Sequence, residues 1–105
     1  MRLRPHEIQA IEQAAKEVFP PGTDVYLFGS RLDDHARGGD IDLLVEPQTP
    51  WSPRQIVDQR TRFVARLYRL LGEQRIDVLI APAAVPDPRP IVEQARKHRA
   101  PLTRV

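Results

Sequence analysis

The amino-acid sequence predicts an α/β domain (mixed α+β) in which about four helices flank a small mixed sheet of three or four strands. Its 105 residues are the size of one ordinary domain. Hydrophobic residues make up 41% and charged residues 29%, which is typical of globular proteins rather than disordered or membrane chains. Segments with helical periodicity alternate with short apolar segments, an order that places helices against a sheet. We therefore expect one domain over residues 1–105.

The first half of the chain predicts one helix and two strands. Apolar residues recur at helical spacing from Pro5, which suits a first helical turn, until the Pro-Pro-Gly sequence at 20–22 stops the helix. Residues 25–28 are short, β-branched and aromatic, which predicts a buried strand. A polar segment over residues 31–39 then leads into a second apolar strand at residues 41–45.

The second half predicts a long helix, a third strand and a last helix. Ser52 is the expected N-cap of the long helix, whose apolar residues mark one face until Gly72, the expected C-cap. The third strand is expected at residues 76–80. A proline-rich connection over residues 82–90 follows, and Asp87 is the expected start of the last helix.

Two aspartates at the start of the second strand are the leading candidates for chemistry. Alternate strand residues point to the same face, and each residue advances about 3.3 Å, so the carboxylates of Asp40 and Asp42 emerge together. Such carboxylates need a cation, an arginine or water. Mg²⁺ binds a few carboxylates and completes its shell with water and phosphate oxygens. Asp77 interrupts the apolar third strand, and it can join the pair if the two strands are neighbours.

A glycine and a serine directly after the first strand are candidates for binding phosphate. Gly29 has no Cβ, so an anion can approach its backbone, and Ser30 adds a hydroxyl donor. A helix beginning here would point free N–H groups at the anion. An anion site beside a metal site is typical of phosphoryl or nucleotidyl transfer from a nucleoside triphosphate. Each piece alone has a simpler explanation, because Gly-Ser is often only a turn, Asp-x-Asp arises by chance, and Asp77 also suits an N-cap or an ion pair.

The order of these residues resembles the minimal nucleotidyltransferase (MNT) family of the polymerase β-like nucleotidyltransferase superfamily. Its signature is Gly-Ser, a spacer, Asp-x-Asp on an apolar strand and a third acid on a later strand, here Gly29, Ser30, Asp40, Asp42 and Asp77. The resemblance covers nearly the whole chain and is most specific between Gly29 and Asp42. Nine residues separate Ser30 from Asp40, one fewer than the commonest family spacing, and a glycine pair in the spacer can absorb the shortening.

The resemblance implies a polymerase β-like nucleotidyltransferase fold and a role for each signature residue. Asp40 and Asp42 would coordinate Mg²⁺. Asp77 would complete the metal site and help to deprotonate the attacking hydroxyl. Gly29 and Ser30 would hold the β- and γ-phosphates of ATP, the expected substrate.

Arginines dominate the basic residues of the chain, which carries a formal net charge of +2. Arg31 and Arg37 of the spacer are further candidates for phosphate contacts, because the guanidinium group binds phosphate through a fork of donors. A solvated loop in which they pair with Asp33 or Asp34 explains them equally well. Arginines on the long helix suit either a solvated face or a docking surface for an acidic protein or RNA, so nucleic-acid binding stays open.

The resemblance also implies an activity and a partner. Members of the family transfer AMP from ATP to an acceptor hydroxyl, and many are antitoxins paired with a helical HEPN-domain toxin that some of them AMPylate on tyrosine. Because larger relatives bind the acceptor with an additional domain that we do not find here, we expect a docked macromolecular acceptor. Two alternatives stay open: a non-catalytic antitoxin that binds its partner, and an aminoglycoside-type transferase that acts on a small molecule.

Composition excludes several other classes of site. The chain has no cysteine, which excludes disulfides, thiolate zinc sites and cysteine nucleophiles. No apolar run approaches the roughly 20 residues of a membrane helix, and the N-terminus lacks the apolar stretch of a secretory signal. We therefore expect a cytoplasmic protein that does not associate with a membrane.

Overall fold

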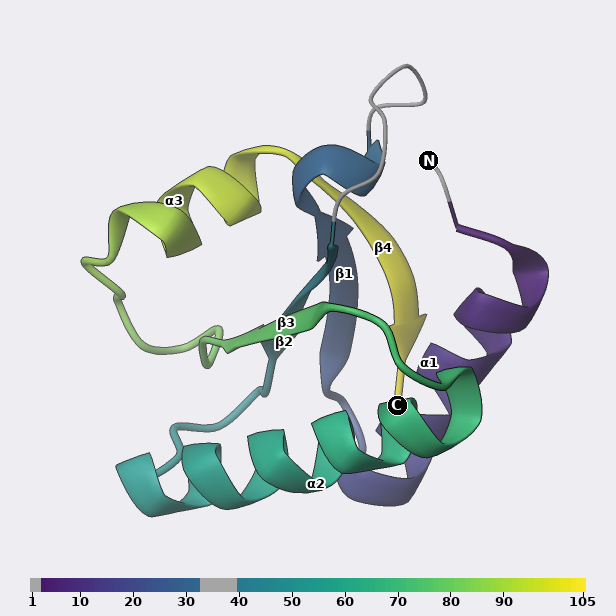
Figure 1. Ribbon diagram of the computed structural model, residues 1–105. Helices are drawn as coiled ribbons and strands as arrows, with labels where there is room; N and C mark the ends of the chain where they lie inside the picture. The colour runs from purple at the N-terminus through teal and green to yellow at the C-terminus, as the bar shows by residue number, and fades with distance from the viewer. Residues whose placement is uncertain (1–2, 33–39) are drawn as a thin grey trace.

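The computed structural model describes residues 3–32 and 40–105 of the chain, and Figure 1 shows helices on both sides of one sheet. In this part of the chain there are three α-helices: α1 (Pro5–Val18), α2 (Pro53–Leu71) and α3 (Pro90–Lys97). The sheet contains four strands: β1 (Asp24–Phe28), β2 (Ile41–Glu46), β3 (Ile76–Ile80) and β4 (Arg99–Arg104). A single 3-10 turn, η1 (Gly29–Leu32), follows β1 directly.

The strands form a mixed sheet in the order β3-β2-β1-β4. β1 runs antiparallel to both of its neighbours, β2 and β4, whereas β2 and β3 are parallel. Parallel strands need a long crossover, and α2 supplies it between β2 and β3. The expected small, mixed, three- or four-stranded sheet is therefore confirmed.

The expectation of about four helices is wrong for the described residues, which contain three α-helices. A further helix was conceivable directly after the first strand, but the chain forms only the four-residue turn η1 there. Gly29 opens this turn with a φ of +79°. Because an α-helix requires φ near −60°, regular helix cannot begin at this residue.

β4 is a strand that the sequence pattern did not place. Its residues are mostly polar or partly exposed, and it contains Pro101, which has no N–H to donate. Proline is tolerated on edge strands, and β4 lies at one edge of the sheet, paired with β1 alone. α3 also begins later than expected, at Pro90, because the carboxylate of Asp87 accepts hydrogen bonds from Arg89 in the turn before the helix.

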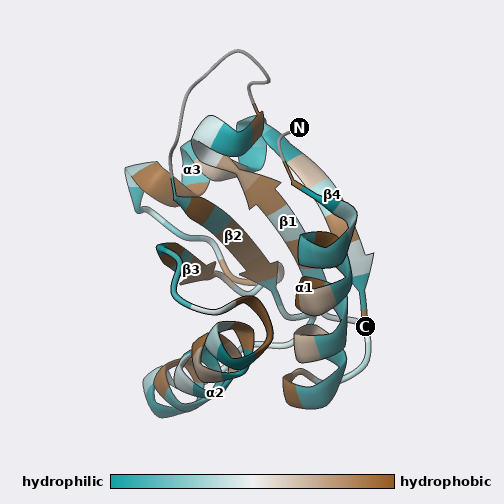
Figure 2. Ribbon diagram, turned by 45° about the vertical axis from the view of Figure 1, so that its right-hand side comes forward, coloured by the Kyte–Doolittle hydropathy of each residue, from teal (hydrophilic) through white to brown (hydrophobic). Residues whose placement is uncertain are grey.

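The long helix α2 begins and ends where its sequence predicts. The hydroxyl of Ser52 accepts a hydrogen bond from the backbone N–H of Gln55 (3.2 Å), whose side chain accepts one from the N–H of Ser52 (2.8 Å). Gly72 closes the helix with a φ of +77°. Figure 2 shows α2 striped with hydrophobic and hydrophilic colour, as expected for a helix with one buried face.

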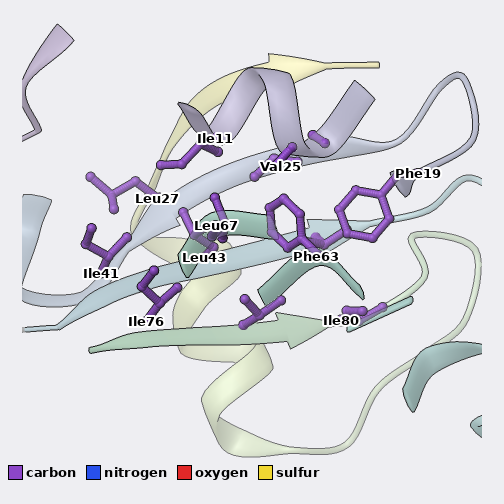
Figure 3. Close-up of a cluster of buried hydrophobic side chains, with 14 residues drawn as sticks. Ile11, Phe19, Val25, Leu27, Ile41, Leu43, Phe63, Leu67, Ile76 and Ile80 are labelled. Atoms are coloured by element: carbon purple, nitrogen blue, oxygen red, sulfur yellow. The ribbon is translucent and has the colours of Figure 1, made fainter. Parts of the chain in front are cut away.

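The main hydrophobic core lies between the sheet and the pair α1 and α2 (Figure 3). Ile11 of α1 and Phe63 and Leu67 of α2 are fully buried there. The rings of Phe19 and Phe63 lie 4.6 Å apart, centroid to centroid, at the end of α1. A second, smaller cluster joins the opposite face of the sheet to α3: Leu44, Ala81, Val92 and Ala95, with Tyr26, Phe28 and Leu79 beside them. The two clusters hold all four strands in place, so residues at the strand ends are rigidly positioned.

A buried ion-pair cluster joins β2 to α3 and β4. The side chain of Glu46, at the end of β2, is only 7% exposed. Its two carboxylate oxygens accept hydrogen bonds from Arg96 (2.6 Å) and Arg99 (2.8 Å). The guanidinium group of Arg99 also lies over the ring of Tyr26, 3.9 Å from its centroid.

We expect Glu46→Gln to lower the free energy of unfolding by about 2 kcal/mol, because a buried, charge-assisted pair of hydrogen bonds is lost and two arginines stay partly buried. Urea denaturation measures this change. The matched control is Glu93→Gln, which removes the exposed Glu93–Lys97 pair on α3 and should cost less than about 1 kcal/mol. Equal costs for the two variants would show that the Glu46 cluster does not hold α3 and β4.

Candidate functional site

The candidate site lies at the end of the sheet where β1 ends and where β2 and β3 begin (Figure 1). Asp42 is the second residue of β2, and the backbone register places it between Phe28 of β1 and Asp77 of β3. Neighbouring strands are about 4.8 Å apart, so Asp42 and Asp77 stand side by side in the parallel pair. Asp77 could join the pair only if its strand were a neighbour of the second strand, and the two strands are paired.

Both carboxylates lie on the face of the sheet opposite α1 and α2. The residues that flank them in the strands, such as Leu43 and Val78, belong to the main core on the other face. Leu44, two residues after Asp42, packs in the smaller cluster with α3. Strand alternation therefore places Asp42 and Asp77 on the α3 side, at the end of the strands.

Asp42 is the electrostatically perturbed residue of the site. Partial burial, together with the negative charges of Asp77 and Asp40, raises the pKa of Asp42 from 3.8 to about 6. Within residues 3–32 and 40–105, no ion pair or side-chain hydrogen bond is made by any of these three carboxylates. Among the described residues, the fold thus concentrates negative charge at this point without a direct ion-pair partner, as expected where a cation binds.

The three acids are neighbours, but in the described part of the chain no group of three or more His, Cys, Asp or Glu side chains is close enough to hold a metal ion. Asp77 is exposed, and Asp40 precedes β2. Like charges repel one another, so without a cation the side chains are expected to spread apart. The donor set nonetheless fits Mg²⁺, which takes one or two carboxylates and fills its other positions with water and phosphate oxygens.

Gly29 brings the backbone of η1 close to the carboxylate of Asp42. A Cβ added to Gly29 would overlap the Oδ2 atom of Asp42 and would lie 3.0 Å from its Cγ atom. Only glycine therefore allows the backbone to pass beside this carboxylate, and the φ of +79° separately favours glycine here. Gly29 and the acids are thus parts of one site.

Ser30 and Arg31 continue η1 beside Gly29. The guanidinium group of Arg31 lies 3.8 Å from the carboxylate of Glu7, a buried residue in the first turn of α1. Arg31 is thereby held between α1 and the site. Arg37, the other arginine predicted to contact phosphate, lies outside the described residues.

A polar cavity of about 570 Å³ opens beside Asp40 at this end of the sheet. Its lining comes from the start of α1, from η1 and from the residues before β3: Arg4, His6, Glu7, Arg31, Asp40, Gln74 and Arg75. Three arginines in one cavity give a suitable surface for phosphate oxygens. Sequence reasoning missed Glu7, Arg4 and Arg75, although Arg75 precedes Asp77 by only two residues.

A second cavity, of about 360 Å³, lies on the other side of η1, and we call it the apolar cavity. It lies between η1 and α3, which Figure 1 shows close to each other beyond the end of β1. Its lining includes Phe28, Gly29, Leu32, Ile91, Gln94 and His98. Gly29 therefore borders both this cavity and the carboxylate of Asp42.

Comparison with known proteins does not assign the chain to a family. No family model matches it, and no curated protein is significantly similar to it. Within the described residues, none of the helices has both the length and the apolar character needed to cross a membrane. A function must therefore be argued from the site itself.

Proposed function

We propose that the chain is a Mg²⁺-dependent nucleotidyltransferase that transfers AMP from ATP to a hydroxyl group of a macromolecular acceptor. The observation that carries the proposal is the pairing of Asp42 with Asp77 in adjacent parallel strands, directly beside Gly29. Paired carboxylates next to a backbone that admits an anion suit a metal–triphosphate complex. The resemblance of the Gly-Ser and Asp-x-Asp segment to minimal nucleotidyltransferases agrees with this arrangement.

In the proposed reaction, the acceptor oxygen attacks the α-phosphorus of ATP. The bond from that phosphorus to the oxygen bridging the α- and β-phosphates breaks, and pyrophosphate leaves. Asp77, which is exposed at the strand end, receives the hydroxyl proton. Arg31 and the other arginines of the polar cavity orient the phosphates. Mg²⁺ held by Asp40 and Asp42 would neutralise charge on the phosphate oxygens.

The acceptor that we propose is a HEPN-type toxin, on which the chain would act as an antitoxin. This part of the proposal depends on the family resemblance. The exposed arginines of α2 suit an acidic partner, although Arg66 already pairs with Glu17 of α1. The proposed adduct is AMP on a hydroxyl side chain of the toxin.

We expect the wild-type chain, incubated with Mg²⁺, α-labelled ATP and its HEPN partner, to transfer label to the partner. Asp77→Asn should lower the rate by about 100-fold or more, because a proton acceptor and a metal ligand are lost from an exposed position that the fold does not need. The matched control is Glu93→Gln on α3, another exposed carboxylate, which lines neither cavity and should leave the rate unchanged. A partner that binds but takes up no label would contradict the proposal.

A second candidate function is a non-catalytic antitoxin that neutralises its partner by binding. The observation that favours it is the absence, in the described residues, of three acidic or histidine side chains grouped around a metal position. Protection of cells discriminates the two functions. If Asp77→Asn protects cells as well as the wild type does, transfer is unnecessary and the binding function holds.

A further inference from the structure

The apolar cavity presents an exposed hydrophobic side chain that packing in the core does not explain. Ile91 lies at the start of α3 with 53% of its surface exposed, whereas the next residue, Val92, is fully buried in the smaller core cluster. Ile91 nonetheless lines the apolar cavity together with Phe28 and Leu32. These side chains give the cavity walls of hydrocarbon and aromatic character.

The cavity also contains polar groups with unused hydrogen-bonding capacity. Gln94 of α3 and His98, the residue directly after this helix, line the cavity, and both are exposed. Among the described residues, neither side chain has a hydrogen-bond partner. A volume of about 360 Å³ with mostly apolar walls and a few polar groups is typical of sites for small molecules.

The position of the cavity restricts what it can hold. η1 separates it from the polar cavity, because Gly29 and Leu32 line the apolar cavity while Arg31 lines the polar one. Asp42 lies against Gly29, which lines the apolar cavity. A ligand that fills both cavities must have a flat, weakly polar part and an anionic part, joined beside the carboxylates.

The geometry points to the apolar cavity as the binding site for the base of a purine nucleotide, an inference that rests on the proposed function. Ile91 and Phe28 contact the faces of the base, and the triphosphate extends past Gly29 towards Arg31. The side-chain amide of Gln94 hydrogen-bonds the edge of the base, as amides do with N6 and N7 of adenine. Base preference is therefore set by α3, outside the Gly-Ser and Asp-x-Asp segment.

Isothermal titration calorimetry in Mg²⁺ buffer with two probes, ATP and inorganic tripolyphosphate, tests the inference. Wild type should bind ATP about tenfold more tightly than tripolyphosphate. Ile91→Ser should weaken ATP binding about tenfold while leaving tripolyphosphate binding unchanged, because only the contact with the base is lost. The matched control is Val57→Ser on α2, a branched apolar residue that is 61% exposed and distant from the cavity, and it should change neither affinity.

The outcomes separate this inference from the proposed function. If wild type binds neither probe, both the proposed function and the inference fail. If wild type binds both probes equally well, or if Ile91→Ser weakens both alike, the base does not occupy the cavity although the proposed function stands. If Ile91→Ser leaves ATP affinity intact but lowers transfer to the partner, the cavity holds an acceptor side chain instead, and the inference is overturned.

Discussion

Replacing Asp42 with asparagine is expected to reduce nucleotidyl transfer by about 1,000-fold or more and, in buffer without divalent cations, to stabilise the fold. The two effects have one cause. Asp42 is partly buried beside Asp77 and Asp40, and its ionised form is disfavoured there unless a cation is bound. Asparagine keeps the size of the side chain but removes the charge, so the repulsion and the metal ligand disappear together. A transfer assay and urea denaturation in EDTA measure the two effects.

The stabilisation should depend on pH. Because the pKa of Asp42 rises from 3.8 in the unfolded chain to about 6 in the folded protein, the folded state retains a proton that the unfolded state releases. The stability contributed by this group is fully present below about pH 4 and is lost as pH rises through about 6. The full shift corresponds to about 3 kcal/mol, and solvent screening of a partly exposed carboxylate reduces this to about 1 kcal/mol.

The difference between wild type and Asp42→Asn isolates this effect from other titrating groups. The pKa values of Glu17 and Asp87 are lowered by Arg66 and Arg89, so these groups give the opposite trend in both proteins. In EDTA, the free energy of unfolding of the variant should increase relative to that of wild type as pH rises from 4 to 7. Mg²⁺ should stabilise wild type alone. Equal stabilities across this range, or equal gains with Mg²⁺, would contradict the assignment of Asp42 as a charged metal ligand.

Local patterns in the sequence were sufficient for those parts of the fold that depend on neighbours along the chain. Alternation in an apolar strand placed Asp42 on one face, and the Ser52 and Gly72 caps set the limits of α2. β4 was not predicted, because this edge strand contains Pro101 and has neither a continuous apolar run nor clear alternation. Its place depends on pairing with a strand more than 70 residues earlier.

The candidate site, like the fold, was predictable from the sequence only in part. The acids were found from the sequence, but their adjacency depends on the parallel register that aligns Asp42 with Asp77. That register is a consequence of the α2 crossover and of core packing, which no local pattern contains. The two cavities could not be predicted from the sequence. Glu7 and Ile91 line them only because α1 and α3 pack against opposite faces of the sheet.

Gly29→Ala is expected to lower nucleotidyl transfer by about 100-fold or more, because it forces η1 and the carboxylate of Asp42 apart. The new methyl group would overlap Oδ2 of Asp42, so either the carboxylate must turn or η1 must move. The left-handed φ of +79° adds about 1 kcal/mol of backbone strain. Transfer rate and the free energy of unfolding, measured on the same preparations, report the two effects.

Gly72→Ala separates backbone strain from the loss of space beside Asp42. Gly72 has nearly the same φ, +77°, but a Cβ there meets no atom within 4 Å. Because its φ of +77° and ψ of −163° suit glycine almost alone, Gly72→Ala should cost about 1–3 kcal/mol of stability and leave transfer unchanged. The excess cost of Gly29→Ala should then shrink when Asp42 is also replaced by alanine, because the overlapping oxygen is gone. If instead Gly29→Ala and Gly72→Ala transfer AMP at the same rate, the close approach of η1 to Asp42 has no functional role, and the anion site must lie elsewhere along η1.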